Sequence, residues 1–317
     1  MSNLFPFADC FSNIFPKNMN NFHLKDYIQE RKQIVDRHLD ALLPKPEGPS
    51  GLVVEAMRYS LSAGGKRVRP ILMMAACDAV GGNHGNIMPA ACAMECVHTY
   101  SLIHDDLPAM DDDDLRRGKP TCHKVYGEAI AILAGDGLLT YAFELMTHPE
   151  LLSAVENSVV NNAISIFAKA AGVAGMVGGQ TADILFEGKE IDADTLAYIH
   201  RHKTGALIKA SVEMGAMLGG GSEEQVEGLA RFGTALGLAF QVVDDLLDVI
   251  GDEKKLGKPV GSDERNQKAT YPALFGLEET KKRAQDLKNQ ALDALEPFGP
   301  EADPLRAIAI YVVERDR

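Results

Sequence analysis

The chain has 317 residues, of which 46% are apolar and 24% are charged, a balance that excludes a disordered or fibrous protein. Its net charge of −13 argues against a nucleic-acid partner, because broad binding to nucleic acid depends on an excess of Lys and Arg. A local group of cations could still bind a small anion. No uninterrupted apolar stretch reaches the roughly 18 residues of a membrane span, so we expect no stable membrane insertion.

The cysteine content predicts a reducing compartment, and we expect the protein in the cytoplasm. The number of cysteines is odd and no CxxC pair occurs. Cys92 and Cys96 are four residues apart, and we expect them to be small buried core residues rather than metal ligands. Residues 1–18 show no helical periodicity and do not resemble a secretory or mitochondrial leader. We treat them as an extension, predicted to be disordered, that precedes a single domain over residues 19–317.

Helical periodicity runs along almost the whole remaining chain, because apolar residues recur at three- and four-residue spacings. Loop 66–69 is expected to lead into a helix with Pro70 at its first position. Alternating strand patterns, flexible linkers and internal repeats are not seen in the sequence, so the fold class is all-α, with about ten helices or more in one bundle. The predicted helices cover residues 24–43, 50–63, 71–80, 89–106, 128–147, 151–172, 174–186, 193–218 and 223–250.

The first of two acidic clusters, residues 105–114, follows an apolar helix and contains six aspartates. Negative charge at a helix C-terminus opposes the helix dipole, so a bound cation would relieve an unfavourable arrangement. Asp105 and Asp111 are six positions apart and would not share a face of an unbroken helix. Pro108 is expected to disturb the helix and could bring Asp111 back towards Asp105.

The second acidic cluster contains Asp244, Asp245 and Asp248 and also follows an apolar segment. Asp244 and Asp248 are four residues apart, so they lie about 40° apart around an ideal helix. Carboxylates that repel each other among apolar side chains are costly to bury without a cation. A hard divalent ion such as Mg²⁺ prefers carboxylate oxygens and shares its coordination shell with phosphates.

Five motifs carry a resemblance to a known family. They are GGKRVRP (64–70), SLIHDDLPAMDDDDLRRGKPT (101–121), GGQTAD (178–183), HKTGALI (202–208) and FQVVDDLLDVIGDEKKLGKP (240–259). In order and content, the chain resembles short-chain trans-isoprenyl diphosphate synthases, most closely the bacterial-type farnesyl diphosphate synthases. The resemblance covers roughly residues 19–317. It implies an isoprenoid-synthase-type helical bundle around a deep central cavity, usually assembled as a homodimer.

The resemblance also implies the reaction. Isopentenyl diphosphate would condense head-to-tail with dimethylallyl or geranyl diphosphate, after Mg²⁺-assisted ionisation to an allylic cation, with release of diphosphate. These isoprenyl diphosphates would be the small-molecule partners. The expected product is (2E,6E)-farnesyl diphosphate, with geranylgeranyl and then geranyl diphosphate as the alternatives.

Metal and allylic sites follow from the same resemblance. Three Mg²⁺ ions are implied: Asp105 and Asp111 would hold two of them with Asp106 nearby, and Asp244 would hold the third, with Asp245 and Asp248 acting through water. The allylic diphosphate would contact Arg116, Lys203 and Lys258. Thr204 and Gln241 would stabilise the cation through uncharged oxygens. The candidate catalytic residues are therefore Lys203, Thr204, Gln241 and Lys258.

The isopentenyl diphosphate site is implied to consist of Gly65, Lys66, Arg69, His98 and Arg117, and the departing diphosphate is the expected proton acceptor. The group formed by Lys66, Arg67 and Arg69 opposes the overall acidity of the chain, as a site for a trianion should. His104 and His123 lie nearby and are expected to be structural, because Mg²⁺ favours oxygen over nitrogen.

Product length is expected to depend on residues just before the first cluster. Tyr100 is five residues before Asp105, about 7.5 Å along a helix, and its ring would floor the cavity; Ser101 is the other candidate. Three alternatives remain for the function: a class I terpene cyclase, a non-catalytic subunit of a heteromeric synthase, and a Mg²⁺-dependent diphosphate hydrolase. The two intact aspartate motifs favour the synthase over the first two.

Overall fold

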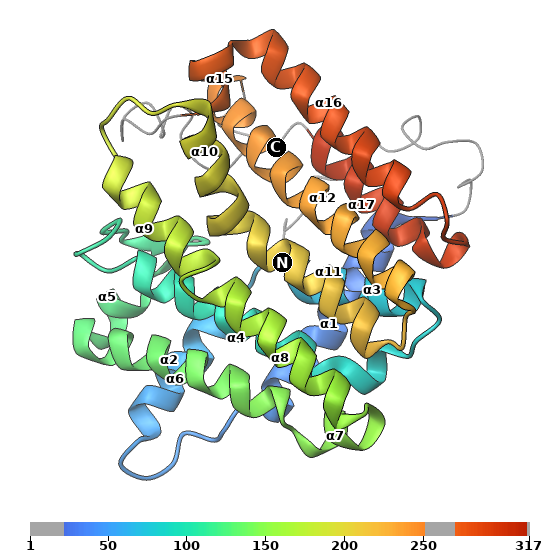
Figure 1. The fold of residues 1–317 in the computed structure, drawn as a ribbon. Helices are drawn as coiled ribbons and strands as arrows, with labels where there is room; N and C mark the ends of the chain where they lie inside the picture. Colours follow the sequence, from blue (N-terminus) through green and yellow to red (C-terminus); the bar gives the residue numbers. More distant parts are fainter. Residues whose placement is uncertain (1–21, 251–269, 316–317) are drawn as a thin grey trace. The chain divides into compact units, whose positions relative to one another are not determined.

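The computed structural model describes residues 22–250 and 270–315 and is almost entirely helical in these ranges, which confirms the all-α prediction (Figure 1). The predicted extension over residues 1–18 lies outside the described residues. The helices are α1 (Leu24–Leu42), α2 (Gly51–Ser62), α3 (Val68–Ala79), η2 (His84–Ile87), α4 (Met88–Asp105), α5 (Cys122–Tyr126), α6 (Glu128–Met146), α7 (Pro149–Ala154), α8 (Asn157–Ala171), α9 (Met176–Phe186), α10 (Ala193–His200), η3 (Arg201–Gly205), α11 (Ala206–Leu218), α12 (Glu223–Ile250), α15 (Tyr271–Phe275), α16 (Leu277–Ala294), η4 (Pro300–Ala302) and α17 (Asp303–Glu314).

Three helix boundaries differ from the sequence expectation. The helix predicted over 151–172 is two helices, α7 and α8, because the backbone at Val155 is extended (φ −130°, ψ 139°). α3 begins at Val68, so Pro70 is its third residue rather than its first. Ser50 precedes α2 but its side chain makes no capping hydrogen bond. Proline and serine therefore indicate helix starts here only to within two residues.

By its internal contacts the chain divides into two compact units. We call the described parts of Ile28–Met74 and Asn83–Ile164 the N-terminal unit. The C-terminal unit comprises the described parts of Met1–Tyr27, Ala75–Gly82 and Ser165–Arg317. The prediction of one domain over 19–317 remains a prediction.

The N-terminal unit is organised around α4, which is buried along almost its whole length and packs on α6. Close approach of these two helices depends on Gly135 in α6. A Cβ atom there would lie 2.1 Å from Nε2 of His104 in α4. That nitrogen lies 3.1 Å from the carbonyl oxygen of Ile132, so His104 joins the two helices, in agreement with a structural role.

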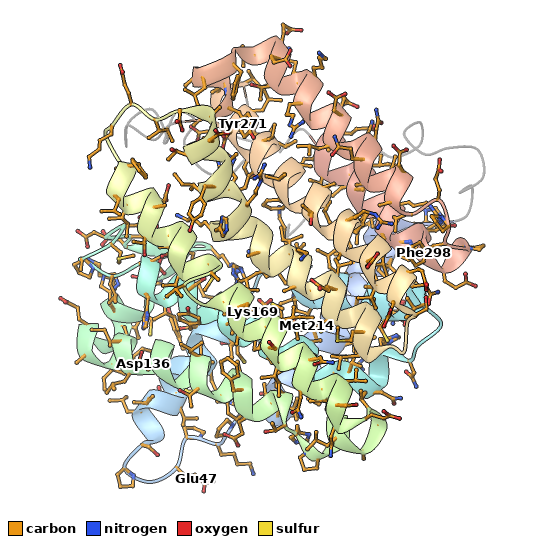
Figure 2. All side chains as sticks on the ribbon, in the orientation of Figure 1. Glu47, Asp136, Lys169, Met214, Tyr271 and Phe298 are labelled. Carbon is orange, nitrogen blue, oxygen red and sulfur yellow. The ribbon has the colours of Figure 1, made fainter. Side chains whose placement is uncertain are left out.

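The C-terminal unit is organised around α12, which packs on α11 and on α16 (Figure 1). Phe298, which follows α16, is labelled in Figure 2. Gly228 in α12 leaves space for its ring, because a Cβ atom at Gly228 would lie 3.3 Å from that ring. Met214 on α11 is fully buried, and side chains fill the spaces between these helices. A 28-residue helix such as α12 is stable because its apolar face is covered in this way.

Two helical segments of the described chain, Glu128–Ala154 and Asn157–Phe186, are long and apolar enough to cross a membrane by length and composition alone. Core helices of soluble proteins pass the same test, so this is weak evidence. Each segment contains the boundary between two helices. The expectation of no stable membrane insertion remains a prediction.

Candidate active site

The first acidic cluster lies in a turn that folds back at the end of α4. The backbone N–H of Asp111 donates to the carbonyl oxygen of Asp105 at 2.9 Å. Asp112 has a positive φ of 49°, a conformation that Asp adopts more readily than most residues. The backbone therefore brings Asp105 and Asp111 together although they are six positions apart, as expected for a helix interrupted near Pro108.

A short hairpin that the sequence did not predict follows this turn. Strands β1 (Leu115–Arg116) and β2 (Lys119–Pro120) pair in antiparallel orientation. Between them Arg117 and Gly118 both have positive φ, 56° and 75°, as in a type I′ turn. The only sequence signal for the hairpin was Gly118 directly after Arg117, because Gly readily adopts the positive φ that the second residue of such a turn needs. Two-residue strands are too short to give an alternating pattern.

Arg116 binds carboxylates of the first cluster from this hairpin. Its Nε donates to Oδ1 of Asp106 at 2.8 Å, and its Nη2 donates to Oδ1 of Asp106 and to Oδ2 of Asp113, the latter at 2.9 Å. The Asp106 side chain is buried. Burial raises the pKa of this carboxyl more than Arg116 lowers it. Asp106 is thus an ion-pair partner of Arg116 here, whereas Asp111 is exposed to solvent.

The residues predicted for isopentenyl diphosphate are brought together in the N-terminal unit. The Arg117 guanidinium lies against Gly65, where a Cβ atom would be 2.5 Å from Nη1, and it donates to the carbonyl oxygen of Gly64. Burial and the nearby charges of Arg69, Arg117, Arg67 and Arg116 hold the pKa of His98 well below its usual range. His98 is therefore a neutral imidazole among cations.

Arg69 and Lys66 lie on either side of the start of α3. Burial lowers the pKa of Arg69 to about 10, and its Nε has no hydrogen-bond partner among the described residues. Lys66 is exposed. The N-terminus of α3 adds backbone N–H groups to these cations, and helix N-termini favour anions. This group of side chains suits a multiply charged anion.

Arg67 differs from Lys66 and Arg69, the two cations beside it in the sequence, because it is buried and its charge is already paired. Its side chain is only 3% exposed and is neutralised by Asp36 at 2.8 Å and by Glu95 at 2.6 Å. Glu95 was missed by the sequence reasoning. Its signal was an acidic residue in the apolar first half of α4, three positions before His98.

The second acidic cluster is part of the continuous helix α12. Asp245 is buried, and its Oδ2 accepts a hydrogen bond from the backbone N–H of Tyr271 at 2.9 Å and lies 3.6 Å from Nε2 of His200. Asp248 is 3% exposed. Asp244 is the accessible member, and its Oδ1 accepts a bond from Arg315 at 2.5 Å. The guanidinium of Arg315 also lies 4.5 Å from the ring centroid of Phe240.

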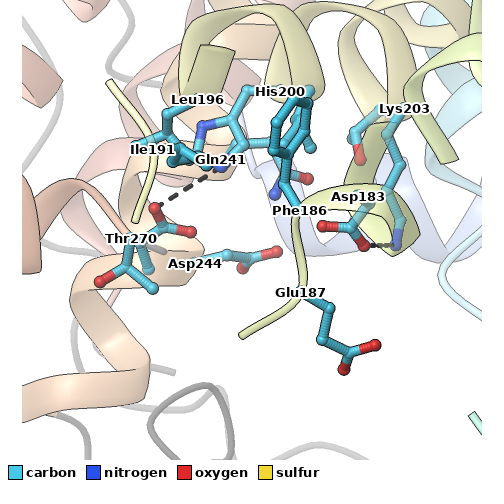
Figure 3. Close-up of a pocket in the computed structure, with 13 residues that line it drawn as sticks. Asp183, Phe186, Glu187, Ile191, Leu196, His200, Lys203, Gln241, Asp244 and Thr270 are labelled. Atoms are coloured by element: carbon cyan, nitrogen blue, oxygen red, sulfur yellow. Dashed lines mark hydrogen bonds and ion pairs between the residues drawn. The ribbon is translucent and has the colours of Figure 1, made fainter. Parts of the chain in front are cut away.

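A pocket of about 180 Å³ in the C-terminal unit gathers most of the catalytic candidates (Figure 3). Lys203, Thr204, Gln241, Asp244 and Asp245 all line it, whereas Lys258 lies outside the described residues. The remaining lining residues are Asp183, Phe186, Glu187, Ile191, Leu196, Ile199, His200 and Thr270. His200, Thr270 and Arg315 were not predicted, because their only signal is proximity in the folded chain.

Lys203 and Thr204 lie in η3, a π-helical turn between α10 and α11. Such wide turns are rare and occur often at functional sites. Nζ of Lys203 donates to Oδ2 of Asp183 at 2.5 Å, as Figure 3 shows. Gly179 in α9 permits this approach, since a Cβ atom there would lie 2.1 Å from the backbone nitrogen of Lys203.

The chain-length candidates lie on α4. The side chain of Tyr100 is buried, and its ring meets His104 edge-on with the ring centroids 5.7 Å apart. Oγ of Ser101 donates to the carbonyl oxygen of His98 at 2.9 Å, so this hydroxyl is used within the helix. Tyr100 is therefore the bulkier and more deeply buried of the two.

Both acidic clusters offer only oxygen donors, which suits Mg²⁺. Within residues 22–250 and 270–315, no group of three or more His, Cys, Asp or Glu side chains stands close enough to hold an ion by itself. Mg²⁺ usually binds through one or two carboxylates and completes its shell with water and substrate phosphates. The donor sets therefore fit Mg²⁺ held together with a diphosphate.

Comparison with known proteins gave consistent results. The polyprenyl synthetase family matches residues 50–296. The chain is 50% identical over 297 residues to a chloroplastic geranylgeranyl pyrophosphate synthase from Capsicum annuum, covering 93% of this chain and 79% of the relative. It is 52% identical over 265 residues to a farnesyl diphosphate synthase from Geobacillus stearothermophilus, covering 84% and 89%. A crystal structure of an FPP/GFPP synthase from Zymomonas mobilis is similar, with a TM-score of 0.82 and 40% identity over 92% of this chain and 98% of that one.

Proposed function

Since the chain belongs to the polyprenyl synthetase family, we propose that it condenses isopentenyl diphosphate with dimethylallyl or geranyl diphosphate and forms mainly (2E,6E)-farnesyl diphosphate. It is a short-chain prenyltransferase of isoprenoid biosynthesis. The observation that carries the proposal is the group of Lys66, Arg69, His98 and Arg117 around the start of α3. In a protein of net charge −13, this group has the charge needed for a diphosphate.

The two substrates need different contacts. Isopentenyl diphosphate keeps its diphosphate, so its site needs fixed cations: Arg69 and Arg117 present planar guanidinium groups for bidentate contacts, and neutral His98 can donate one hydrogen bond. The allylic substrate loses its diphosphate, so its site must stabilise charge that develops on the leaving group. Arg116 and Lys203 supply positive charge for that diphosphate, and both are already paired with carboxylates, Asp106 and Asp183.

Mg²⁺ is part of the proposal. Asp105 and Asp111 of the first cluster and Asp244 of the second would hold it, with Asp106, Asp245 and Asp248 as supporting carboxylates. When bound with diphosphate, Mg²⁺ would supply further positive charge to the leaving group. Thr204 and Gln241 line the same pocket as Lys203 and offer neutral oxygens to a carbocation. The departing diphosphate is the proposed proton acceptor.

Geranylgeranyl diphosphate is the second candidate product, because the Capsicum annuum relative carries that name and is 50% identical. Farnesyl diphosphate is favoured here because the buried ring of Tyr100 lies five residues before Asp105. We also propose that the enzyme is a cytoplasmic homodimer. Exposed Ile132 and Leu133 on α6 are suited to such an interface. Light scattering and cell fractionation test these two points.

The first test is a product assay with purified protein, Mg²⁺, isopentenyl diphosphate and dimethylallyl diphosphate, read by mass spectrometry. A dominant C15 diphosphate supports the proposal, and a dominant C20 product contradicts the assigned length. Release of diphosphate without isopentenyl diphosphate would indicate a hydrolase, and a cyclic hydrocarbon would indicate a cyclase. Absence of elongation with all components present would favour a non-catalytic subunit.

The role of Tyr100 is tested in the same assay. Tyr100→Ala is expected to shift the product towards C20, because the ring no longer blocks the growing chain. Tyr100→Phe is the matched control: it keeps the ring and should keep C15. An unchanged C15 product from Tyr100→Ala would show that another residue limits the chain.

A further inference from the structure

The loop between α2 and α3 has an unusual backbone. Gly64 and Gly65 have φ values of 96° and 137°, which side chains rarely allow. Arg67 has a φ of 52°, although it carries a full side chain. A left-handed conformation is unfavourable for such a residue and persists only where surrounding contacts impose it. Contacts around the loop must therefore hold its backbone in this conformation.

Arg67 makes contacts to three helices that can impose this shape. Its Nε donates to Asp36 of α1 at 2.8 Å, its Nη1 to Glu95 of α4 at 2.6 Å, and its Nη2 to the carbonyl oxygen of Leu61 in α2 at 2.6 Å. We call Asp36, Arg67 and Glu95 the Arg67 network. Arg67 is 4% exposed and Glu95 is fully buried, so the pair is shielded from solvent.

The network is placed where it can act on the predicted isopentenyl site. Arg67 follows Lys66 directly, and its carbonyl oxygen accepts the N–H of Ile71 at 3.0 Å, so Arg67 also sets the start of α3 and thereby the position of Arg69. Glu95 lies one helical turn before His98 on α4. Its Oε2 is buried and has no hydrogen-bond partner among the described residues.

Glu95 also balances the cations of that site. Burial lowers the pKa values of Arg69 and Arg117, and the charge of Glu95 acts on both in the opposite direction. Arg67 and Arg116 repel Arg117 at the same time. Without a buried carboxylate, several guanidinium groups would have to share one region, and their mutual repulsion would separate them.

We infer that Asp36, Arg67 and Glu95 are positioning residues, which hold the loop over residues 64–67 in the shape that presents Lys66 and Arg69 to the diphosphate of isopentenyl diphosphate. This inference rests on the proposed function. The three residues need not touch the substrate. The alternative is that these residues only stabilise the fold. The two roles can be distinguished, because only a positioning role predicts a selective rise in the KM for isopentenyl diphosphate.

The decisive variant removes both buried charges of the network together. Removing one partner would leave a buried charge unpaired and could unfold the chain. Arg67→Met combined with Glu95→Gln leaves the local net charge unchanged and avoids that cost. We expect the KM for isopentenyl diphosphate to rise about 10- to 100-fold, because a small displacement of binding groups is enough for that loss. The KM for geranyl diphosphate should change less than about twofold, and the melting temperature should stay within a few degrees of wild type.

α1 offers a matched control pair. Asp36 and Asp40 lie one helical turn apart, and each accepts a bond from an arginine, Arg67 or Arg58. The side chain of Asp40 is 81% exposed, and the arginine that it pairs with is Arg58. Asp36→Asn should raise the KM for isopentenyl diphosphate severalfold, and Asp40→Asn should leave it unchanged. This pair decides the question if the double variant does not fold.

Failure of the inference can be distinguished from failure of the proposed function. Arg117→Gln tests the site itself and should raise the KM for isopentenyl diphosphate in an otherwise wild-type chain. If it does not, the site assignment is wrong. If Arg117→Gln raises this KM while the double variant and Asp36→Asn keep the wild-type value, the inference is overturned. An equal rise in both substrate KM values, or a fall in kcat alone, would also overturn it, because either indicates general damage.

Discussion

Both acidic clusters consist of aspartates, but the first lies in a turn and the second lies within a continuous helix. In the first, a turn after α4 returns Asp111 to Asp105 through a backbone hydrogen bond, and Asp111 is exposed. In the second, α12 runs without interruption through Asp244, Asp245 and Asp248, and the last two are buried. Asp111 of the first cluster is thus available to a ligand, whereas Asp245 of the second accepts a hydrogen bond that also holds the protein fold. Loss of Asp111 should therefore affect mainly activity, whereas loss of Asp245 should affect both activity and stability.

The largest effect is expected at the first cluster. Asp105→Asn should lower kcat/KM with Mg²⁺ about 10³-fold or more, because it removes a charged oxygen donor while keeping the size of the side chain. Asp112→Asn is the matched control. Asp112 is exposed at a φ of 49°, where Asn is also tolerated. Steady-state kinetics of both variants measure the difference, and equal losses would contradict the separate assignment of these two aspartates.

The second cluster should show a pH dependence of stability through His200. Burial lowers the pKa of His200 from 6.5 to about 4. The folded chain then binds this proton less readily than the unfolded chain, so stability is complete above pH 6.5 and declines as pH falls towards 4. The full effect is about 3 kcal/mol.

His200→Gln should remove that decline. Urea unfolding of both proteins between pH 4 and pH 7, without metal, measures the difference in slope. Parallel curves would show that His200 does not contribute. The carboxyl groups that lie away from His200 titrate in both proteins and cancel in the comparison.

A smaller effect is expected on the free energy of unfolding, and it should differ between the two clusters. Asp245→Ala should lower the free energy of unfolding by about 2 kcal/mol without metal, because the N–H of Tyr271 loses its acceptor in a buried place. Asp111→Ala changes an exposed side chain and should cost less than about 0.5 kcal/mol. Denaturant titration of the two variants tests the contrast. Equal costs would remove the distinction between a ligand-facing and a fold-supporting cluster.

The sequence predicted the position of a residue well where local spacing determines it, and poorly where turn geometry or a distant partner determines it. Helical periodicity was sufficient for α12 and its three aspartates, because their neighbours in space follow from their spacing. The hairpin at Arg116 and Arg117 was missed, because it is set by two positive φ angles over a few residues. The sequence did not show that the charge of Arg67 is already paired, since its partners Asp36 and Glu95 are 31 and 28 positions away. The motifs predicted which residues are candidates for binding diphosphate. Ion pairs between residues far apart in the sequence determine which of the charged side chains are free to bind an anion.

The smallest effect is expected for Arg315, which pairs with partly exposed Asp244. Arg315→Gln should lower the free energy of unfolding by about 1 kcal/mol in EDTA, from loss of this ion pair and of the contact with Phe240. In saturating Mg²⁺ and inorganic diphosphate the difference should narrow, because Asp244 then has a cation in both proteins. A difference that stays constant would show that Asp244 gains no cation under those conditions.

The π-helical turn over residues 201–205 has a consequence for the length of the chain. It lies between α10 and α11 without a break, so residues 193–218 form one continuous helical segment that contains a wide turn. A π turn closes over one residue more than an α turn. Deleting a single residue there would let the turn close as an ordinary α turn, so the faces of α10 and α11 would keep nearly their present directions. The packing of α11 on α12 should therefore survive the loss of one residue from this turn, whereas one deletion inside a regular helix such as α12 would rotate every residue beyond it by about 100°.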